Sequence, residues 1–414
     1  MKIWIVSGSE PIPEITHSGR LMRAGIFCRY ARQKGLDVTW WSSTWMHYEK
    51  RFVSQSDFQT TLEDGTKVFL IHAKKGYQKH VSVKRLLYCR RMGKLFRKRI
   101  NKFDEKPDLI ICSWPLIELA YESIRYAKRN NIPVIIDIRD LWPEIFIQPF
   151  KGIKQLIAKA GVKLLYNFKV KYAVKNAYQI IGVTKDAVDL SYRWGRKANS
   201  IDHPLFLSCL RKEYDEESKD FAMRKWESFG IKDGDKIFVY VGSIHLRNAK
   251  LDLIIQVAKQ LPNIKFVFCG KGPDYDALVN DSKGFENIVF PGYMNELELS
   301  VLERIATCGI LPYSNTPDFI NALPNKLGEY LSNGLPVLTH LKGDSRTILE
   351  AHSCGSYFSN CTELKQLVLR YSMDNDLLSS SKNNALSLFG EYFNADVVYA
   401  DFIDTFKTLF SNGG

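Results

Sequence analysis

The chain has 414 residues, which is too many for a single hydrophobic core, so two domains are expected. Its hydrophobic fraction of 45% and charged fraction of 25% exclude a mainly disordered, collagen-like or coiled-coil protein. The net charge of +13 is uneven: residues 1–200 hold 37 Lys and Arg against 17 Asp and Glu, whereas residues 201–414 are net acidic. Two domains with different partners are indicated, and a basic half can attract nucleic acid, an anionic membrane or an anionic substrate.

Short apolar runs alternate with longer amphipathic segments along the chain. In the first half, the expected strands are Lys2–Val6, Asp37–Trp41, Val68–His72, Asp108–Cys112, Val134–Ile138 and Gln179–Val183. The pattern breaks at residues 203–220, where we place a linker, and it resumes with Ile237–Val241, Lys265–Cys269, Ile288–Phe290, Gly309–Pro312 and Pro336–Thr339. Strands rich in Val and Ile that alternate with helices predict parallel sheets covered on both faces. The fold class is therefore α/β, with two doubly wound parallel-sheet domains facing a cleft.

Targeting and metal-binding signals are weak in this sequence. No apolar run approaches the roughly 18–20 residues that span a bilayer, and the N-terminal strand has no apolar signal core behind it. The eight cysteines are scattered, so free thiols are expected rather than zinc or a disulfide framework. Three Asp-x-Asp pairs, at residues 233–235, 274–276 and 374–376, fall in a turn, a helix start and a polar loop. We expect a cytoplasmic protein without a catalytic metal.

In open α/β sheets, ligands bind beyond the carboxyl ends of the strands, so the residues after each strand are the candidates for a site. No Gly-x-Gly-x-x-Gly follows the first strand, which disfavours a nicotinamide dehydrogenase. Ser18 and Gly19 open the next helix, where backbone N–H groups could face a phosphate or simply form a cap. Arg139 and Asp140 follow the strand Val134–Ile138, and two such charges must enter a cleft or pair with each other.

The second half carries glycine loops at two strand ends. Gly242 and Ser243 follow one strand, and Gly270 follows the next. A glycine lets a ligand approach the backbone. Arg247 or Lys250, further along the first loop, could meet phosphate oxygens.

The strongest local signal lies between Pro324 and Gly334. Pro324 suits the first turn of a helix and Gly334 suits its left-handed cap, which predicts a short, well-bounded helix. Asn325 and Lys326 lie in the first turn, where the helix dipole favours an anion, and Glu329 lies one turn deeper on the same face. This order suits a nucleotide, with its diphosphate at Lys326 and its ribose hydroxyls at Glu329. The alternative is a surface ion pair.

A basic amphipathic helix is predicted over Val83–Ile100. Its polar side holds Lys84, Arg90, Arg91, Lys94, Arg97 and Lys98. The stretch Lys151–Lys175 adds seven lysines and no acidic residue. Both are either solvated faces or surfaces that attract an anionic bilayer. A nucleic-acid partner is not expected, because no recognition motif accompanies these charges.

Two segments carry a resemblance to a known family. Asp137-Ile-Arg-Asp-Leu-Trp-Pro-Glu144 and Pro324-Asn-Lys-Leu-Gly-Glu-Tyr-Leu-Ser-Asn-Gly-Leu-Pro336 are similar to motifs of the family 4 glycosyltransferases, in the bacterial branch that acts in cell-surface polysaccharide synthesis. Less specific glycine turns extend the resemblance to nearly the whole chain, at residues 241–243, 269–273 and 291–294.

The resemblance implies a GT-B fold of two Rossmann-like domains. Residues 1–204, joined by a C-terminal crossover helix at 395–414, would form the acceptor-binding domain. Residues 205–394 would form the domain that binds the nucleotide sugar. The resemblance also implies transfer with retention of anomeric configuration and without a metal or other cofactor.

The chain departs from the family pattern at three positions. The first member of the Glu-x7-Glu pair is Asn321. Ser243 replaces the usual arginine, so Arg247 or Lys250 must take its role at the phosphates. Arg139 replaces a histidine at the end of the central strand. These changes leave the donor sugar undefined.

The resemblance thus implies a hexosyltransferase that uses a nucleoside-diphosphate sugar, expected to be a UDP-sugar. The acceptor is expected to be a polysaccharide precursor or an undecaprenyl-linked saccharide for capsule or O-antigen, at the cytoplasmic face of the inner membrane. Lys326 and Arg247 would neutralise the leaving diphosphate, and Glu329, Arg139 and Asp140 would complete the catalytic set. The alternatives are a sugar-nucleotide epimerase of the same fold and a non-catalytic binder of membrane or nucleic acid.

Overall fold

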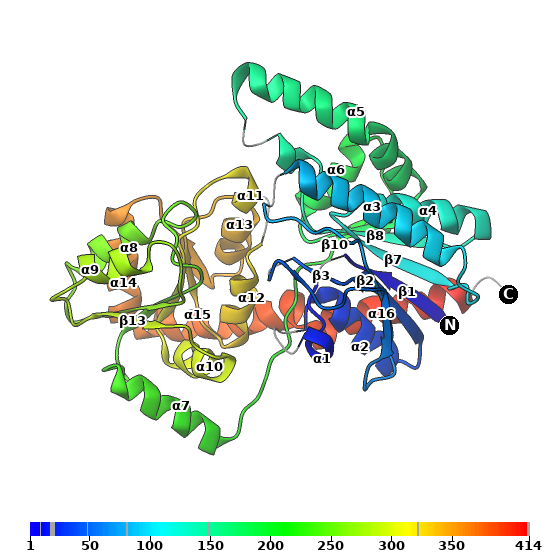
Figure 1. Ribbon diagram of the computed structural model, residues 1–414. Coiled ribbons are helices and arrows are strands. Elements are labelled where there is room, and N and C mark those ends of the chain that lie inside the picture. The colour runs from blue at the N-terminus through cyan, green and yellow to red at the C-terminus, as the bar shows by residue number, and fades with distance from the viewer. Residues whose placement is uncertain are drawn as a thin grey trace. The chain divides into compact units, whose positions relative to one another are not determined.

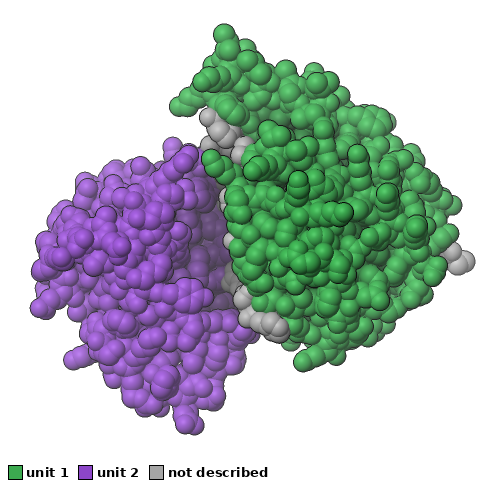
Figure 2. All heavy atoms as spheres, viewed as in Figure 1, with its two compact units in different colours: residues 1–206, 399–414 green, residues 207–398 purple. Residues whose placement is uncertain are grey.

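The structure of the protein is a computed structural model, which describes residues 1–8, 10–16, 21–47, 49–79, 82–147, 150–320 and 323–411. The chain divides into two compact units (Figure 2). Unit 1 consists of Met1–Phe206 and Tyr399–Gly414, and unit 2 consists of Leu207–Val398. The boundaries predicted from the sequence, after residues 204 and 394, lie slightly earlier in the chain.

Unit 1 is built on an eight-stranded sheet (Figure 1). In spatial order its strands are β10 (His203–Pro204), β9 (Gln179–Gly182), β8 (Val134–Ile138), β7 (Leu109–Trp114), β1 (Lys2–Val6), β2 (Asp37–Ser43), β6 (Lys67–Ile71) and β5 (Phe58–Thr61). Strands β7 and β8 are buried along their whole length. Their continuous apolar sequences follow from this position, because helices cover both faces of the sheet.

One edge of this sheet corrects the expectation of purely parallel pairing. Strand β5 runs antiparallel to β6, whereas the other pairs in the sheet are parallel. The strand was missed because it is an exposed edge strand, Phe-Gln-Thr-Thr, without an apolar side. A further antiparallel pair joins β3 (Trp45–Met46) to β4 (Arg51–Phe52).

The helices of unit 1 form a layer on each face of the sheet (Figure 1). They are α1 (Pro13–Thr16), α2 (Arg23–Gln33), α3 (Val83–Ile100), α4 (Ile117–Asn130), a 3-10 turn (Glu144–Phe146), α5 (Gly152–Asn176), α6 (Lys185–Arg193) and α16 (Ala395–Ser411). On one face α3 packs on α4, and α4 packs on α5. On the other face α2 packs on α16, where the Phe27 ring lies 4.8 Å from Tyr399 and 5.6 Å from Phe402. The C-terminal helix therefore completes the core of unit 1.

Unit 2 contains a six-stranded sheet whose pairs are all parallel. Its spatial order is β13 (Ile288–Gly292), β12 (Lys265–Cys269), β11 (Ile237–Val241), β14 (Cys308–Leu311), β15 (Val337–Thr339) and β16 (Gly355–Tyr357). Its helices are α7 (Glu216–Ser228), α8 (Leu251–Ala258), α9 (Tyr275–Asp281), α10 (Glu296–Ile305), α11 (Pro317–Ile320), α12 (Asn325–Ser332), α13 (Asp344–Ala351), α14 (Cys361–Met373), α15 (Asn375–Leu388) and a π-helical turn (Phe389–Phe393).

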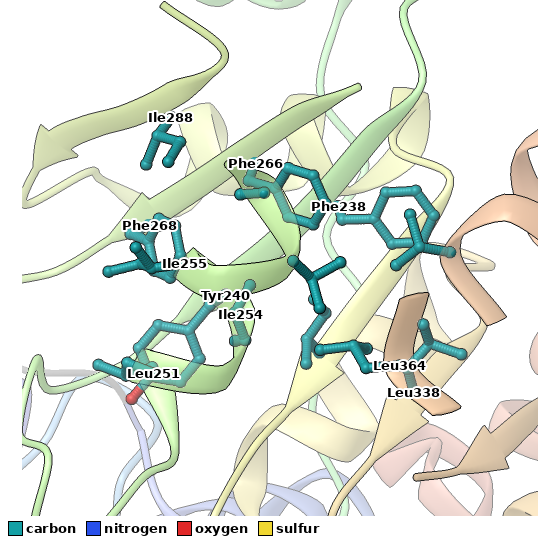
Figure 3. Packing of buried hydrophobic residues seen from close by; sticks show 14 of the residues in the cluster. Phe238, Tyr240, Leu251, Ile254, Ile255, Phe266, Phe268, Ile288, Leu338 and Leu364 are labelled. Atoms are coloured by element: carbon teal, nitrogen blue, oxygen red, sulfur yellow. The ribbon is translucent and has the colours of Figure 1, made fainter. Parts of the chain in front are cut away.

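The core of unit 2 holds the strand ends in place. Aromatic side chains of β11 and β12 pack against the apolar face of α8, as Figure 3 shows for Phe238, Tyr240, Phe266, Phe268, Leu251, Ile254 and Ile255. Because these residues are almost wholly buried, they fix the two strands against the helix that follows β11. The α/β class and the parallel sheets predicted from the sequence are confirmed.

Candidate active site

The glycine loops after β11 and β12 touch each other through their backbones. The N–H of Gly242 donates to the carbonyl of Cys269 at 3.0 Å, and that of Gly270 donates to Gly292 at 2.7 Å. Gly270 has a φ of +136°, and a Cβ there would lie 1.9 Å from the carbonyl oxygen of Gly242. Only glycine fits, so these strand ends form a tightly packed surface of backbone groups.

The loop that carries Ser243, Arg247 and Lys250 runs beside the segment that follows β14. The backbone N–H of Lys250 donates to the carbonyl of Pro312 at 2.7 Å, and Ala249 forms a bridge with Tyr313. Ser243, Arg247 and Lys250 are exposed. Neither cationic side chain has an ion-pair partner among the described residues, so both are available to an anion.

Helix α12 begins directly after Pro324, which is its N-cap, and ends before Gly334, which has a φ of +68°. The short, bounded helix predicted from the sequence is confirmed, with Pro324 one position earlier than expected. Lys326 and Glu329 form an ion pair. The i,i+3 ion pair considered as the alternative is therefore present, with side chains that are only 20% and 17% exposed.

A buried tyrosine fixes α12 against the end of β11. The Tyr330 hydroxyl accepts from the N–H of Val241 at 2.9 Å and donates to the carbonyl of Val239 at 3.4 Å. A Cβ at Gly309 in β14 would lie 2.5 Å from the Tyr330 ring, so the glycine makes room for it. The helix that carries Lys326 therefore adjoins the strand that leads into Gly242. The sequence analysis missed this tyrosine, because the pairing joins distant segments.

A second carboxylate, Glu303 of α10, lies close to the ion pair. Asn333 donates to one of its oxygens at 2.8 Å, while the other oxygen is buried with no hydrogen-bond partner among the described residues. Burial raises the pKa of Glu303 to about 7, Lys326 opposes that rise and Glu329 adds to it. Glu303 was not predicted from the sequence, because α10 holds a second buried acid, Glu298, and no local pattern tells the two apart.

In unit 1, the residues after β8 meet a buried charge cluster. Asp137, within the strand, accepts from Arg23 at 3.0 and 2.9 Å and from Arg139 at 2.7 Å. Arg139 also pairs with Glu10. Burial lowers the pKa of Arg139 to about 10, against the opposing effects of Tyr399 and Asp140. The hydrogen bond of Arg139 therefore goes to Asp137, an acid that the sequence analysis did not single out.

The other predicted residues have different environments. Asp140 is exposed, and its backbone carbonyl accepts from the N–H of Trp142 at 2.8 Å. Ser18, Gly19 and Asn321 lie outside the described residues.

The predicted free state of all eight cysteines is confirmed.

The described residues hold neither a cluster of metal ligands nor a helix that could span a membrane. No three His, Cys, Asp or Glu side chains there come together as metal ligands would. None of the described helices has the length and hydropathy that a membrane span requires.

Unit 2 presents both positive charge and hydrogen-bond acceptors to a ligand. Lys326 and the first-turn N–H groups of α12 offer positive charge beside the glycine loops, and Arg247 and Lys250 add exposed cations. Glu329 offers acceptor oxygens one turn deeper. The set suits a ligand that is anionic at one end and rich in hydroxyl groups at the other.

Comparison with known proteins agrees with this chemistry. Residues 224–387, within unit 2, match the family model described as glycosyl transferases group 1. The alpha-monoglucosyldiacylglycerol synthase of Acholeplasma laidlawii is 21% identical over 322 residues, which cover 75% of each chain.

Solved structures are similar over essentially the whole chain. Sucrose-phosphate synthase from Thermosynechococcus elongatus has a TM-score of 0.71 at 13% identity and covers 100% of both chains. HepE from Anabaena in complex with UDP-glucose has a TM-score of 0.63 at 13% identity, covering 99% of this chain and 100% of that one. Unit 2 thus matches the glycosyl transferases group 1 model, and the whole chain has the GT-B fold of these solved structures. The resemblance to family 4 enzymes is thereby confirmed at this coarse level.

Proposed function

We propose that the protein transfers a sugar from a UDP-sugar to a polysaccharide precursor or a lipid-linked saccharide, with retention of configuration and without a protein-bound metal. The observation that carries the proposal is the shielded Lys326–Glu329 pair beside the glycine loops of unit 2. Solved relatives add support, since HepE is described in complexes with UDP and UDP-glucose. The curated relative is named as a synthase of a glucosyl lipid, which favours a lipid-linked acceptor.

In this proposal the ion pair opens when the donor binds. Lys326 turns to the diphosphate, with Arg247 or Lys250 contributing at its exposed side, and Glu329 accepts hydrogen bonds from the ribose hydroxyls. Each charge exchanges one partner for another, so neither is left buried and unpaired. Ser243 and Gly242 let the phosphates approach the backbone, as Gly270 does in the adjoining loop.

The chemical step then needs stabilisation of a developing negative charge. The bond between the anomeric carbon and the phosphate oxygen breaks, and the acceptor oxygen bonds to the same face of that carbon. The proton of the acceptor hydroxyl passes to the departing phosphate oxygen. Lys326 stabilises the leaving diphosphate in this assignment.

The test uses the full chain, a panel of UDP-, GDP- and ADP-sugars, and a lipid-linked saccharide acceptor. We expect one UDP-sugar to be consumed only when acceptor is present, in EDTA as well as without it. The anomeric configuration read by NMR in the product should match the donor. An inverted product, or loss of activity in EDTA, would contradict the stated mechanism. Isomerisation of the sugar nucleotide in the absence of acceptor would instead show an epimerase.

The place of action in this proposal is the cytoplasmic face of the inner membrane. A lipid-linked acceptor is confined to a bilayer, so an enzyme that uses it gains from residing at the surface. The first 200 residues carry the positive charge that anionic lipids attract. Fractionation of cells that produce the protein should place it with the membranes at low salt, and recovery only in the soluble fraction would contradict this assignment.

A further inference from the structure

Helix α5 has two faces with different surroundings. Residues on one face of its second half are buried in unit 1, where the helix packs on α4; they are Val162, Tyr166, Val170, Ala173 and Val174. Its first half, up to Gly161, contains no buried residue. The helix therefore continues beyond the body of unit 1, as Figure 1 shows.

The face turned away from unit 1 is apolar. Five of its side chains are each 63–87% exposed: Ile153, Leu156, Ile157, Leu164 and Phe168. At 3.6 residues per turn, these positions share one side of the helix, roughly 120° wide, which adjoins the side that holds the buried residues. Single exposed apolar residues are ordinary, but five large ones in a row on one helix face mark an interaction surface.

Cations border this apolar face. Lys154, Lys159 and Lys163 are exposed on its flanks, Lys171 is exposed within it, and the stretch 145–185 contains no Asp or Glu. One lysine of the helix, Lys169, is neutralised inside unit 1, where it pairs with Glu118 at 3.4 Å. An apolar stripe edged by exposed lysines is the pattern of a helix that lies in the plane of an anionic lipid surface.

We propose that α5 inserts its apolar face into the interfacial layer of an anionic bilayer, with the lysines at the level of the lipid phosphates. A second copy of the chain is a poorer occupant, because the same lysines would face each other across the contact. The inference deepens the proposed function, since it names the surface that would bring the enzyme to a lipid-linked acceptor. It also goes beyond electrostatic attraction, because salt screens the attraction between charges but does not remove the binding that comes from inserted apolar side chains.

Helix α3 contrasts with α5 in how it uses its charges and its apolar side. The apolar side of α3 is buried at Tyr88, Cys89, Met92, Phe96 and Ile100. Part of its basic side is engaged within unit 1, since Arg91 donates to the carbonyl of Ala73 at 2.9 Å and Arg97 pairs with Glu122 at 3.9 Å. In this proposal the basic residues of α3 attract the anionic bilayer, and the apolar side chains of α5 insert into it.

The experiment is cosedimentation of the full chain with vesicles of phosphatidylglycerol and phosphatidylcholine, or of phosphatidylcholine alone, at low and high salt. The test variant carries Ile153→Ser, Leu156→Ser and Ile157→Ser, three exposed changes in the half of α5 that contains no buried residue. The matched control carries Phe221→Ser, Tyr293→Ser and Met373→Ser, whose side chains are 64–82% exposed in unit 2. A third variant, Leu164→Trp, reports the depth of the helix through the fluorescence that it adds to that of the wild type.

The expected result is that the wild type and the control pellet with the anionic vesicles and are retained in part at high salt. The test variant should lose roughly tenfold or more of its vesicle affinity. Bromine-labelled lipids should quench the emission of the Leu164→Trp variant more strongly than that of the wild type. UDP binding should be the same in every variant. A further variant with large apolar residues at the same three positions, Ile153→Phe, Leu156→Phe and Ile157→Phe, should pellet with the vesicles like the wild type.

Three outcomes would overturn the proposal. The test variant pellets as well as the wild type, the matched control loses as much as the test variant, or light scattering shows that the serine changes alter self-association without lipid. The readouts are separate from catalysis. Failure of sugar transfer with vesicle binding intact would contradict the proposed function and leave the docking surface standing.

Discussion

The two units each bury a cluster of charged side chains near the end of a strand, and the clusters differ in how completely they are satisfied. In unit 1, Asp137 is held by Arg23 and Arg139, and Arg139 is paired in turn with Glu10. The two acids, Asp137 and Glu10, therefore neutralise the two bases, Arg23 and Arg139. We call this cluster closed because each charged side chain has a partner of opposite charge within it, as in a structural network.

In unit 2 the balance is incomplete. Lys326 faces two acids, Glu329 and Glu303, and one oxygen of Glu303 has no hydrogen-bond partner among the described residues. The pair itself is partly accessible, and exposed cations stand on the neighbouring loop. The comparison teaches that buried charge alone does not mark a site. A cluster whose groups can exchange partners is the better candidate for binding a ligand.

The largest effect is expected where the closed cluster is broken. Asp137→Ala leaves Arg23 and Arg139 buried without their shared carboxylate, and we expect a loss of about 3–5 kcal/mol in the free energy of unfolding. Denaturant titration measures it. The exposed Asp140→Ala should cost less than about 1 kcal/mol. Equal stability of Asp137→Ala and the wild type would show that the network is not structural.

The open cluster should respond through ligand affinity. Lys326→Ala removes a charge-assisted contact to the diphosphate, worth roughly 1.5–3 kcal/mol, or about 10- to 150-fold in the dissociation constant for UDP. UMP has one phosphate fewer, so its affinity should fall much less. If Lys326→Ala weakens UMP and UDP equally, Lys326 does not contact the diphosphate.

Glu303 should give the stability of unit 2 a pH dependence. Its pKa is raised from 4.5 to about 7 in the folded chain, so the native state keeps a proton that the unfolded state releases. Stability should therefore fall as pH rises between those values, by up to about 1.4 kcal/mol per pH unit. Glu303→Gln should flatten that segment of the stability curve. A Glu303→Gln curve parallel to the wild type would contradict the shift.

The smallest effects are expected on the exposed loop. Arg247→Ala and Lys250→Ala each remove a solvated cation, and screening limits such contacts to about 0.2–1 kcal/mol. Calorimetry with UDP should show which of the two replaces the arginine whose place Ser243 occupies, since only that variant should weaken UDP more than UMP. If neither variant changes UDP affinity, this loop does not hold the phosphates.

Local sequence patterns predicted the strands and helices that are determined by residues close together in the chain. The Val- and Ile-rich strands, the helix over Val83–Ile100 and the short helix after Pro324 all follow from periodicity and end residues. The exposed edge strand β5 has no such pattern and was missed.

The partners within each cluster could not be predicted in the same way. Arg23 meets Asp137 across more than a hundred residues, and Tyr330 reaches Val241 only because β14 leaves space at Gly309. Glu303 comes near Lys326 because α10 and α12 belong to one folded unit. Such pairings depend on tertiary packing, which the order of residues along one segment does not reveal.

The most direct test of the account is calorimetry of Glu329→Gln with UMP, UDP and UDP-glucose, beside the wild type and Lys326→Ala. The account states that Glu329 leaves Lys326 to accept the ribose hydroxyls, so Glu329→Gln should weaken all three ligands by a similar factor, because all carry the ribose. Lys326→Ala should weaken UDP and UDP-glucose much more than UMP. Wild-type affinity of Glu329→Gln for UMP and UDP would contradict the account and would make the Lys326–Glu329 pair a structural contact.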